Sequence, residues 1–109
     1  MLVRRNRPGE NIDYLNAGAA AIQEGDVVAL GARGIGIAGA TIDPGEVGSV
    51  WVEGVFIFPK AAGALSLGAD VYWDAAAKNV TASDSGNVIA GWAVQVAGAS
   101  DSSALVKIG

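Results

Sequence analysis

The chain has 109 residues, of which 51% are hydrophobic and 16 are glycines, and its formal net charge is −4. It contains no cysteine and no histidine, which excludes disulfides, thiolate chemistry, the usual general base and the commonest transition-metal ligand. The acidic balance argues against non-specific binding of nucleic acid, and no apolar run approaches the roughly 18 residues of a membrane span. We therefore expect one soluble domain that is intracellular when it is made.

The first ten residues are predicted to form an arm that precedes the folded domain. Arg4, Arg5 and Arg7 are three of the seven basic residues, and Pro8-Gly9 ends the segment with a turn signal. The arm is either a solvated terminus without fixed structure or a basic strap that orders on an acidic partner.

Residues 11–109 are predicted to form a single all-β domain of short strands joined by turns. Asp43-Pro44-Gly45-Glu46 is the strongest turn, because proline and glycine stand where a β-turn favours them. Gly54 is expected to interrupt the longest strand run as a bulge or a close backbone approach would, and Pro59 is expected to end it. In the first part of the chain the expected strands are 11–16, 27–30, 35–38, 49–53 and 55–58.

The second half of the chain resembles the first. Gly36-Ile37-Ala38 is echoed by Gly91-Trp92-Ala93, and Val50–Gly54 is echoed by Leu105–Gly109 at the same spacing. A hairpin is predicted between them, with strands at 71–74 and 79–81. Little helix is expected, since the alanine-rich windows are too short to form helices alone.

These features predict an all-β fold, a compact sandwich or small barrel of short antiparallel strands with two similar halves and a flexible N-terminal arm. The halves are predicted at about 11–58 and 59–109.

Motifs for nucleotide binding are weak. Gly34-Ile35-Gly36-Ile37-Ala38-Gly39 matches the dinucleotide pattern G-x-G-x-x-G, but that mechanism needs a helix to begin there. Asp43-Pro44-Gly45 follows too soon to allow such a helix. None of the three lysines lies in a Gly-Lys-Ser/Thr sequence, so no P-loop is present.

Catalytic and metal-binding patterns are also weak. The acidic pairs, such as Asp43 with Glu46 and Asp70 with Asp74, lie in or beside predicted turns, where aspartate is explained by backbone hydrogen bonding. Asp84-Ser85-Gly86-Asn87 lacks the ligand number and the closing glutamate of a calcium loop. The sequence therefore predicts no enzyme, no cofactor, no metal and no small-molecule substrate.

Two motifs at a defined spacing suggest a family. Gly54-Val55-Phe56-Ile57-Phe58-Pro59-Lys60 and Val71-Tyr72-Trp73-Asp74 together closely resemble the capsid cement (decoration) proteins of tailed bacteriophages, a group sometimes mislabelled as recombinase-like. The resemblance runs nearly end to end, from Pro8-Gly9 to the segment 91–109. One departure is the basic start of this chain, which leaves the role of the arm open.

The resemblance implies a protein made in the host cytoplasm that binds the outer surface of the assembled virion capsid. It would bridge neighbouring subunits of the major capsid protein. It would also bind copies of itself, with a homotrimer expected. Neither nucleic acid nor membrane is expected as a partner. Capsid or subunit contacts are expected at Arg4, Arg5, Arg7, Lys60 and Trp51. The alternative is a surface binding module on a β scaffold, which would recognise glycans or a host surface through its tryptophans.

Overall fold

The computed structural model describes Val3 and residues 9–109. Most of the predicted arm, with Arg4, Arg5 and Arg7, lies outside the described residues. The described part is all-β, as predicted. Its strands are β1 (Asn11–Leu15), β2 (Val27–Ala29), β3 (Ile35–Ala38), β4 (Val47–Trp51), β5 (Gly54–Pro59), β6 (Asp70–Asp74), β7 (Asn79–Thr81), β8 (Val88–Ala93) and β9 (Ser103–Ile108).

Helix is scarce throughout this part of the chain. One short 3₁₀ turn, η1 (Gly31–Arg33), joins β2 to β3. Within the described ranges, no helix has the length and apolar character needed to cross a membrane. The prediction of many short strands with little helix is therefore confirmed.

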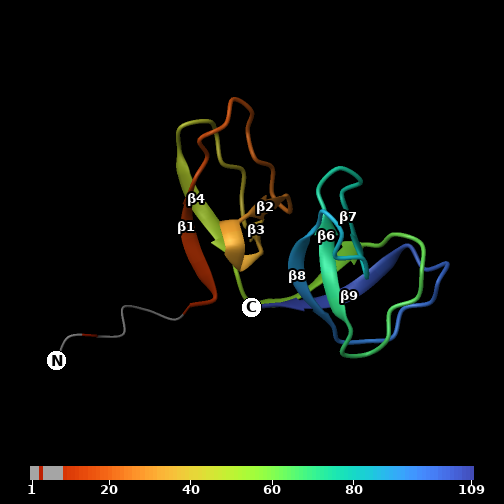
Figure 1. Cartoon of the computed structure of the whole chain (residues 1–109). Helices are drawn as coiled ribbons and strands as arrows, with labels where there is room; N and C mark the ends of the chain where they lie inside the picture. The colour runs from red at the N-terminus through yellow and green to blue at the C-terminus, as the bar shows by residue number, and fades with distance from the viewer. Residues whose placement is uncertain (1–2, 4–8) are drawn as a thin grey trace.

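The strands form two antiparallel sheets that lie side by side (Figure 1). The chain leaves the first sheet at Trp51 and enters the second at Gly54, whose φ of 139° is a conformation that favours glycine. The predicted bulge at Gly54 is therefore wrong, because the residue marks a change of sheet. Pro59 ends β5, as expected. The change of sheet precedes the predicted division between residues 58 and 59.

The two sheets share one strand order. The first is ordered β1-β4-β3-β2, and the second is ordered β5-β9-β8-β6 with β7 added at its edge. The registers correspond, since Ala38 pairs with Val50 in the first sheet and Ala93 pairs with Val106 in the second. The two predicted similar halves are thus a real repeat of strand order and pairing.

The connecting loops repeat as well. An isolated bridge joins Ile22 to Ile42 in the first half, and another joins Leu65 to Ala97 in the second. Ile42 packs into the smaller core with Ile22 against it, and Leu65 and Ala97 pack into the larger core. The correspondence therefore extends from the strands to the loops that connect them.

The predicted echo between Val50–Gly54 and Leu105–Gly109 is wrong by one residue. Val50 corresponds in register to Val106, because the loop 94–102 is one residue longer than the loop 39–46. Both valines have no exposed surface, so the corrected register matches one buried position with another.

Each half has a core. The smaller core contains Val28, Ile42 and Val50, with Tyr14, Ile22, Leu30 and Val52 packed against it. The larger core is built mainly from the second sheet, but it includes Ile35 and Ile37 of β3. These two side chains join the halves, since they pack into the same cluster as Phe58 of β5.

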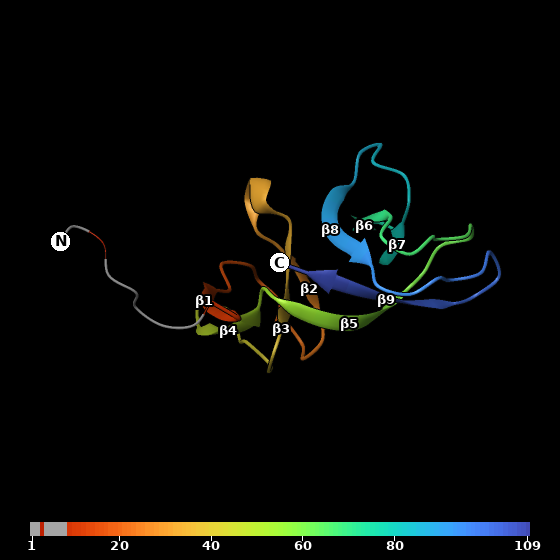
Figure 2. The same cartoon turned by 90° about the horizontal axis from the view of Figure 1, so that it is seen from below.

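The second sheet curls toward closure. After β5, Lys60 forms a parallel bridge with Val80 of β7, and the Ala61 amide donates to the Val80 carbonyl at 2.9 Å. The hairpin β6–β7 closes through a turn at residues 75–78, as predicted. Strand β5 is thus held at one end, while most of its length remains at the edge of the sheet (Figure 2).

Candidate interaction surfaces

Trp51 lies at the end of β4 and is 38% exposed. It pairs across the sheet with Asn11 on one side and Ile37 on the other. Its indole lies over Gly39, where an added Cβ would come within 3.3 Å of the Trp51 Nε1. Trp51 therefore presents a half-exposed aromatic surface beside the junction of the two sheets.

Lys60, the other predicted contact in the described part of the chain, is buried. It is only 8% exposed, and its Nζ donates to the Ala61 carbonyl at 2.9 Å and weakly to the Asp101 carbonyl at 3.4 Å. The ammonium is used internally, to hold the segment after β5 to the turn before β9. Its ammonium group is therefore already engaged within the fold.

Asn16 occupies the position in the first half that corresponds to Lys60. The backbone amide of Asn16 donates to the Glu46 carbonyl at 2.9 Å, and the backbone amide of Lys60 donates to the Ser102 carbonyl at 3.0 Å. Asn16 is buried, with only 3% of the residue exposed, and its Nδ2 donates to the carbonyls of Ala20 and Ile42. Each half thus uses one buried polar side chain to fasten its loops.

One face of the second sheet is open and largely apolar. We call it the open face, and its members share one side of strands β5, β9 and β8. Ile57 pairs directly with Leu105, and Val55 pairs with Lys107, which in turn pairs with Trp92. Ile57 is 75% exposed, Val55 54% and Trp92 41%. The open face consists of Val55, Ile57, Trp92, Leu105 and Lys107.

The corresponding face of the first sheet is partly covered. Trp92 corresponds in register to Ile37, which is only 8% exposed because it packs into the core that joins the two sheets. The two halves thus carry corresponding faces. In the first half this face is partly covered by the second sheet, and in the second half it is uncovered.

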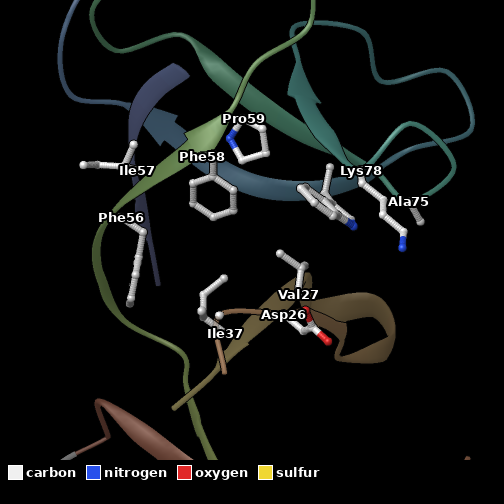
Figure 3. Close-up of a pocket in the computed structure, with 11 residues that line it drawn as sticks. Asp26, Val27, Ile37, Phe56, Ile57, Phe58, Pro59, Ala75 and Lys78 are labelled. Carbon is white, nitrogen blue, oxygen red and sulfur yellow. The ribbon is translucent and has the colours of Figure 1, made fainter. Parts of the chain in front are cut away.

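A groove of about 480 Å³ lies between β5, the β6–β7 hairpin and the first sheet (Figure 3). Phe58 points into it, and Val27 and Ile37 lie across from Phe58, whereas Ile57 points away. Phe58 and Trp73 pack edge to face with ring centres 6.2 Å apart. The groove therefore has an apolar floor.

Two charged side chains flank the side of this groove away from β5. Asp26 comes from the turn before β2, and Lys78 comes from the hairpin turn (Figure 3). One oxygen of Asp26, Oδ2, accepts the Gln23 amide at 2.9 Å. Lys78 has a φ of 57°, which is uncommon for a residue with a side chain. The groove thus carries one anion and one cation at its mouth.

Two of the aspartates predicted to serve turns, Asp74 and Asp101, accept backbone amides within their turns, whereas Asp43 and Asp70 form no such side-chain bond among the described residues. Asp74 Oδ1 accepts the amides of Ala76 and Ala77 at 3.0 and 3.1 Å, and Asp101 Oδ2 accepts the Gly98 amide at 2.7 Å. Among the described residues, no group of three or more acidic, histidine or cysteine side chains is placed to hold a metal ion.

The glycine-rich pattern at 34–39 is part of a strand. Gly36 lies inside β3 and pairs with Val28, so no helix begins there. Its counterpart Gly91 lies in β8, where an added Cβ would overlap the carbonyl oxygen of Lys107. Both glycines are explained by the close approach of a neighbouring strand.

The open face and the groove were missed by reasoning from the sequence. Alternation of Val55 and Ile57 with Phe56 and Phe58 does indicate two faces, but all four are apolar and either face could be buried. Only the exposure in the folded structure shows which face is free, since Val55 and Ile57 are largely exposed and Phe58 is buried.

Comparisons with known proteins give one match. The sequence fits the family described as phage cement protein over residues 6–108. No curated protein and no solved structure matches the chain.

Proposed function

Because the chain belongs to the phage cement protein family, we propose that it binds the outer surface of an assembled phage capsid and bridges neighbouring major capsid protein subunits. The observation that carries this proposal is the family match, which covers nearly the whole chain. A structural role of this kind requires no catalysis, and we assign none to the chain.

The open face is the surface that we propose for contact with the capsid or with a neighbouring copy. Its exposed apolar side chains would gain by leaving water, at about 25 cal/mol per Å² of buried apolar area. The first half supports this use, because it buries the corresponding face around Ile37 against the second sheet. Trp51, half-exposed beside that junction, is included as a secondary contact.

The arm would extend the contact along the capsid. Arg4, Arg5 and Arg7 would pair with acidic groups there, in the manner of a basic strap. A homotrimer would multiply both kinds of contact, since linked weak contacts bind far more tightly together than alone. Burial of about 800 Å² on each partner, the usual size of a specific interface, is within reach of a domain of this size.

The experiment is reconstitution on heads of the encoding phage that lack the protein. Added protein is expected to co-sediment with expanded heads and to raise their disruption temperature. Protein that fails to bind, or that binds without raising this temperature, would refute the cement function. Deletion of residues 1–9 is expected to lower the occupancy of the protein on heads and to make this occupancy less sensitive to salt. Unchanged occupancy and salt sensitivity would exclude the strap.

The alternative function, recognition of glycans through tryptophans, receives little support from the structure. In the part of the chain that is described, the one close aromatic pair is Phe58 with Trp73, so the tryptophans do not stack into a platform. A glycan array with the isolated protein is expected to be silent.

A further inference from the structure

Among the described residues, strand β5 has unpaired backbone groups on one edge. Its only strand partner in this part of the chain is β9, and in an antiparallel pair alternate residues direct their N–H and C=O groups away from the partner. The Lys60 amide donates toward β9, to Ser102, whereas the Ala61 amide donates the other way, to Val80. By this alternation Val55 and Ile57 direct their amides away from β9, and no hydrogen bond to either amide is formed within the described residues.

Within the part of the chain that the structure describes, this edge lacks the usual protection against pairing with another strand. Native edge strands are short, or carry charges, or are covered. In this protein β2 and β7 have three residues each, and β1 carries Asp13. By contrast, β5 has six residues, none of them charged, and its proline comes only at the end. The edge is therefore suited to receive a further strand.

The groove lies along this same edge. Its lining includes Phe56, Phe58 and Pro59 of β5 together with Trp73 and Val27. A strand placed beside β5 would direct every second side chain toward this apolar floor. The concave shape fits a single extended segment better than the edge of a second folded sheet.

Asp26 and Lys78 would face the far edge of that segment. An ammonium donates and a carboxylate accepts, so the pair is suited to the free carbonyl and amide groups of a backbone. Their opposite charges leave the mouth of the groove without net charge. Lys78 holds its place in spite of a left-handed backbone that would favour glycine or asparagine, as residues at binding sites sometimes do.

We propose that the groove receives an extended, uncharged and mainly apolar segment of the capsid surface, which adds to the second sheet as a strand beside β5. The inference rests on the proposed function, since it names how the capsid is held. The neutral, apolar groove argues against the arm of a second copy as the occupant, because that arm carries three arginines. It equally argues against a charged ligand.

The test is hydrogen exchange measured by mass spectrometry on free protein and on protein bound to expanded heads. The amides of Val55 and Ile57 are expected to exchange quickly in free protein and at least tenfold more slowly on heads. The peptide 103–108, from the interior strand β9, is the internal control and should change little. Bound protein whose β5 amides are not protected would overturn the inference and leave the cement function standing.

Two variants at one position separate the backbone from the side chain. Ile57→Ala and Ile57→Pro both remove the exposed side chain, but only the proline also removes the outward amide. Loss of one hydrogen bond predicts about tenfold weaker binding to heads for Ile57→Pro than for Ile57→Ala. Equal affinities of the two folded variants would overturn the inference.

If Ile57→Pro does not fold, the exchange measurement decides by itself. Protection of β5 that appears in the protein alone and rises with its concentration would assign the groove to a second copy and overturn the proposal. Absence of any binding to heads would overturn both this inference and the cement function.

Discussion

Asn16 provides the sharpest test of how the loops are held. Its side chain is buried, and it forms three hydrogen bonds: Nδ2 donates to Ala20 O at 2.9 Å and to Ile42 O at 2.8 Å, and Oδ1 accepts the Gly18 amide at 3.0 Å. Asn16→Ala removes all three. At about 1 kcal/mol net for each bond, the free energy of unfolding should fall by about 3 kcal/mol.

Some of this loss is recovered by the groups left behind. Ile42 O keeps the Ile22 amide as a donor at 2.9 Å, and Ala20 lies in an exposed loop where water can replace the lost bond. We therefore expect a decrease of about 2–3 kcal/mol, which corresponds to a melting temperature lower by about 10–20 °C for a domain of this size.

Asn87→Ala is the matched control. Asn87 also donates to a carbonyl, that of Ser83 at 3.0 Å, but the bond is exposed to solvent. Its loss should change the free energy of unfolding by no more than about 0.5 kcal/mol. Urea and thermal unfolding followed by circular dichroism measure both variants. If Asn16→Ala were as stable as Asn87→Ala, the idea that this side chain fastens the loops would fail.

Three further results are expected. Gly91→Ala should destabilise the fold by about 3 kcal/mol or more, because its Cβ would overlap the fixed carbonyl of Lys107. Gly36→Ala meets only contacts of 3.2–3.4 Å and should lower the free energy of unfolding by less than about 1 kcal/mol. Equal urea midpoints for the two variants would contradict this. Lys78→Gly should raise the free energy of unfolding by about 1 kcal/mol through relief of its left-handed backbone, yet weaken binding to heads in sedimentation. Trp92→Ala should leave the melting temperature within a few degrees and reduce head occupancy at limiting protein, and unchanged occupancy would remove the open face from the contact surface.

Local sequence signals predict most of the strands. The turn signals at Gly25 and Gly68 correspond to glycines with φ of 87° and 84°, and the strands that follow them begin close to the predicted positions. The hairpin of β6 and β7 is predicted correctly because aromatic and β-branched residues flank a short turn. Such signals depend on neighbouring residues alone, which is why a single sequence reveals them.

Features that depend on distant pairing are harder to predict. The change of sheet at Gly54 resembles a bulge in the sequence, because a glycine between two apolar strands is typical of either event. The burial of Lys60 depends on the carbonyls of Ala61 and Asp101, and the second of these is far away in the sequence. The free edge of β5 is visible only once β9 is known to be its single strand partner among residues 9–109.

The repeat of strand order also allows strands to pair with the wrong partner while the chain folds. Strands β1 and β5 occupy corresponding edges, so each is a competitor for the other's partner, and an exchange between two chains would give a swapped dimer. The side chains oppose the pairing of β1 with β9 in the place of β5. Tyr14 would then stand where Phe58 does and bring its hydroxyl group into a buried, apolar site beside Ala104, at a cost in free energy. Tyr14→Phe would weaken this preference for the native pairing. Refolding of the variant is then expected to be slower and to give more swapped dimer.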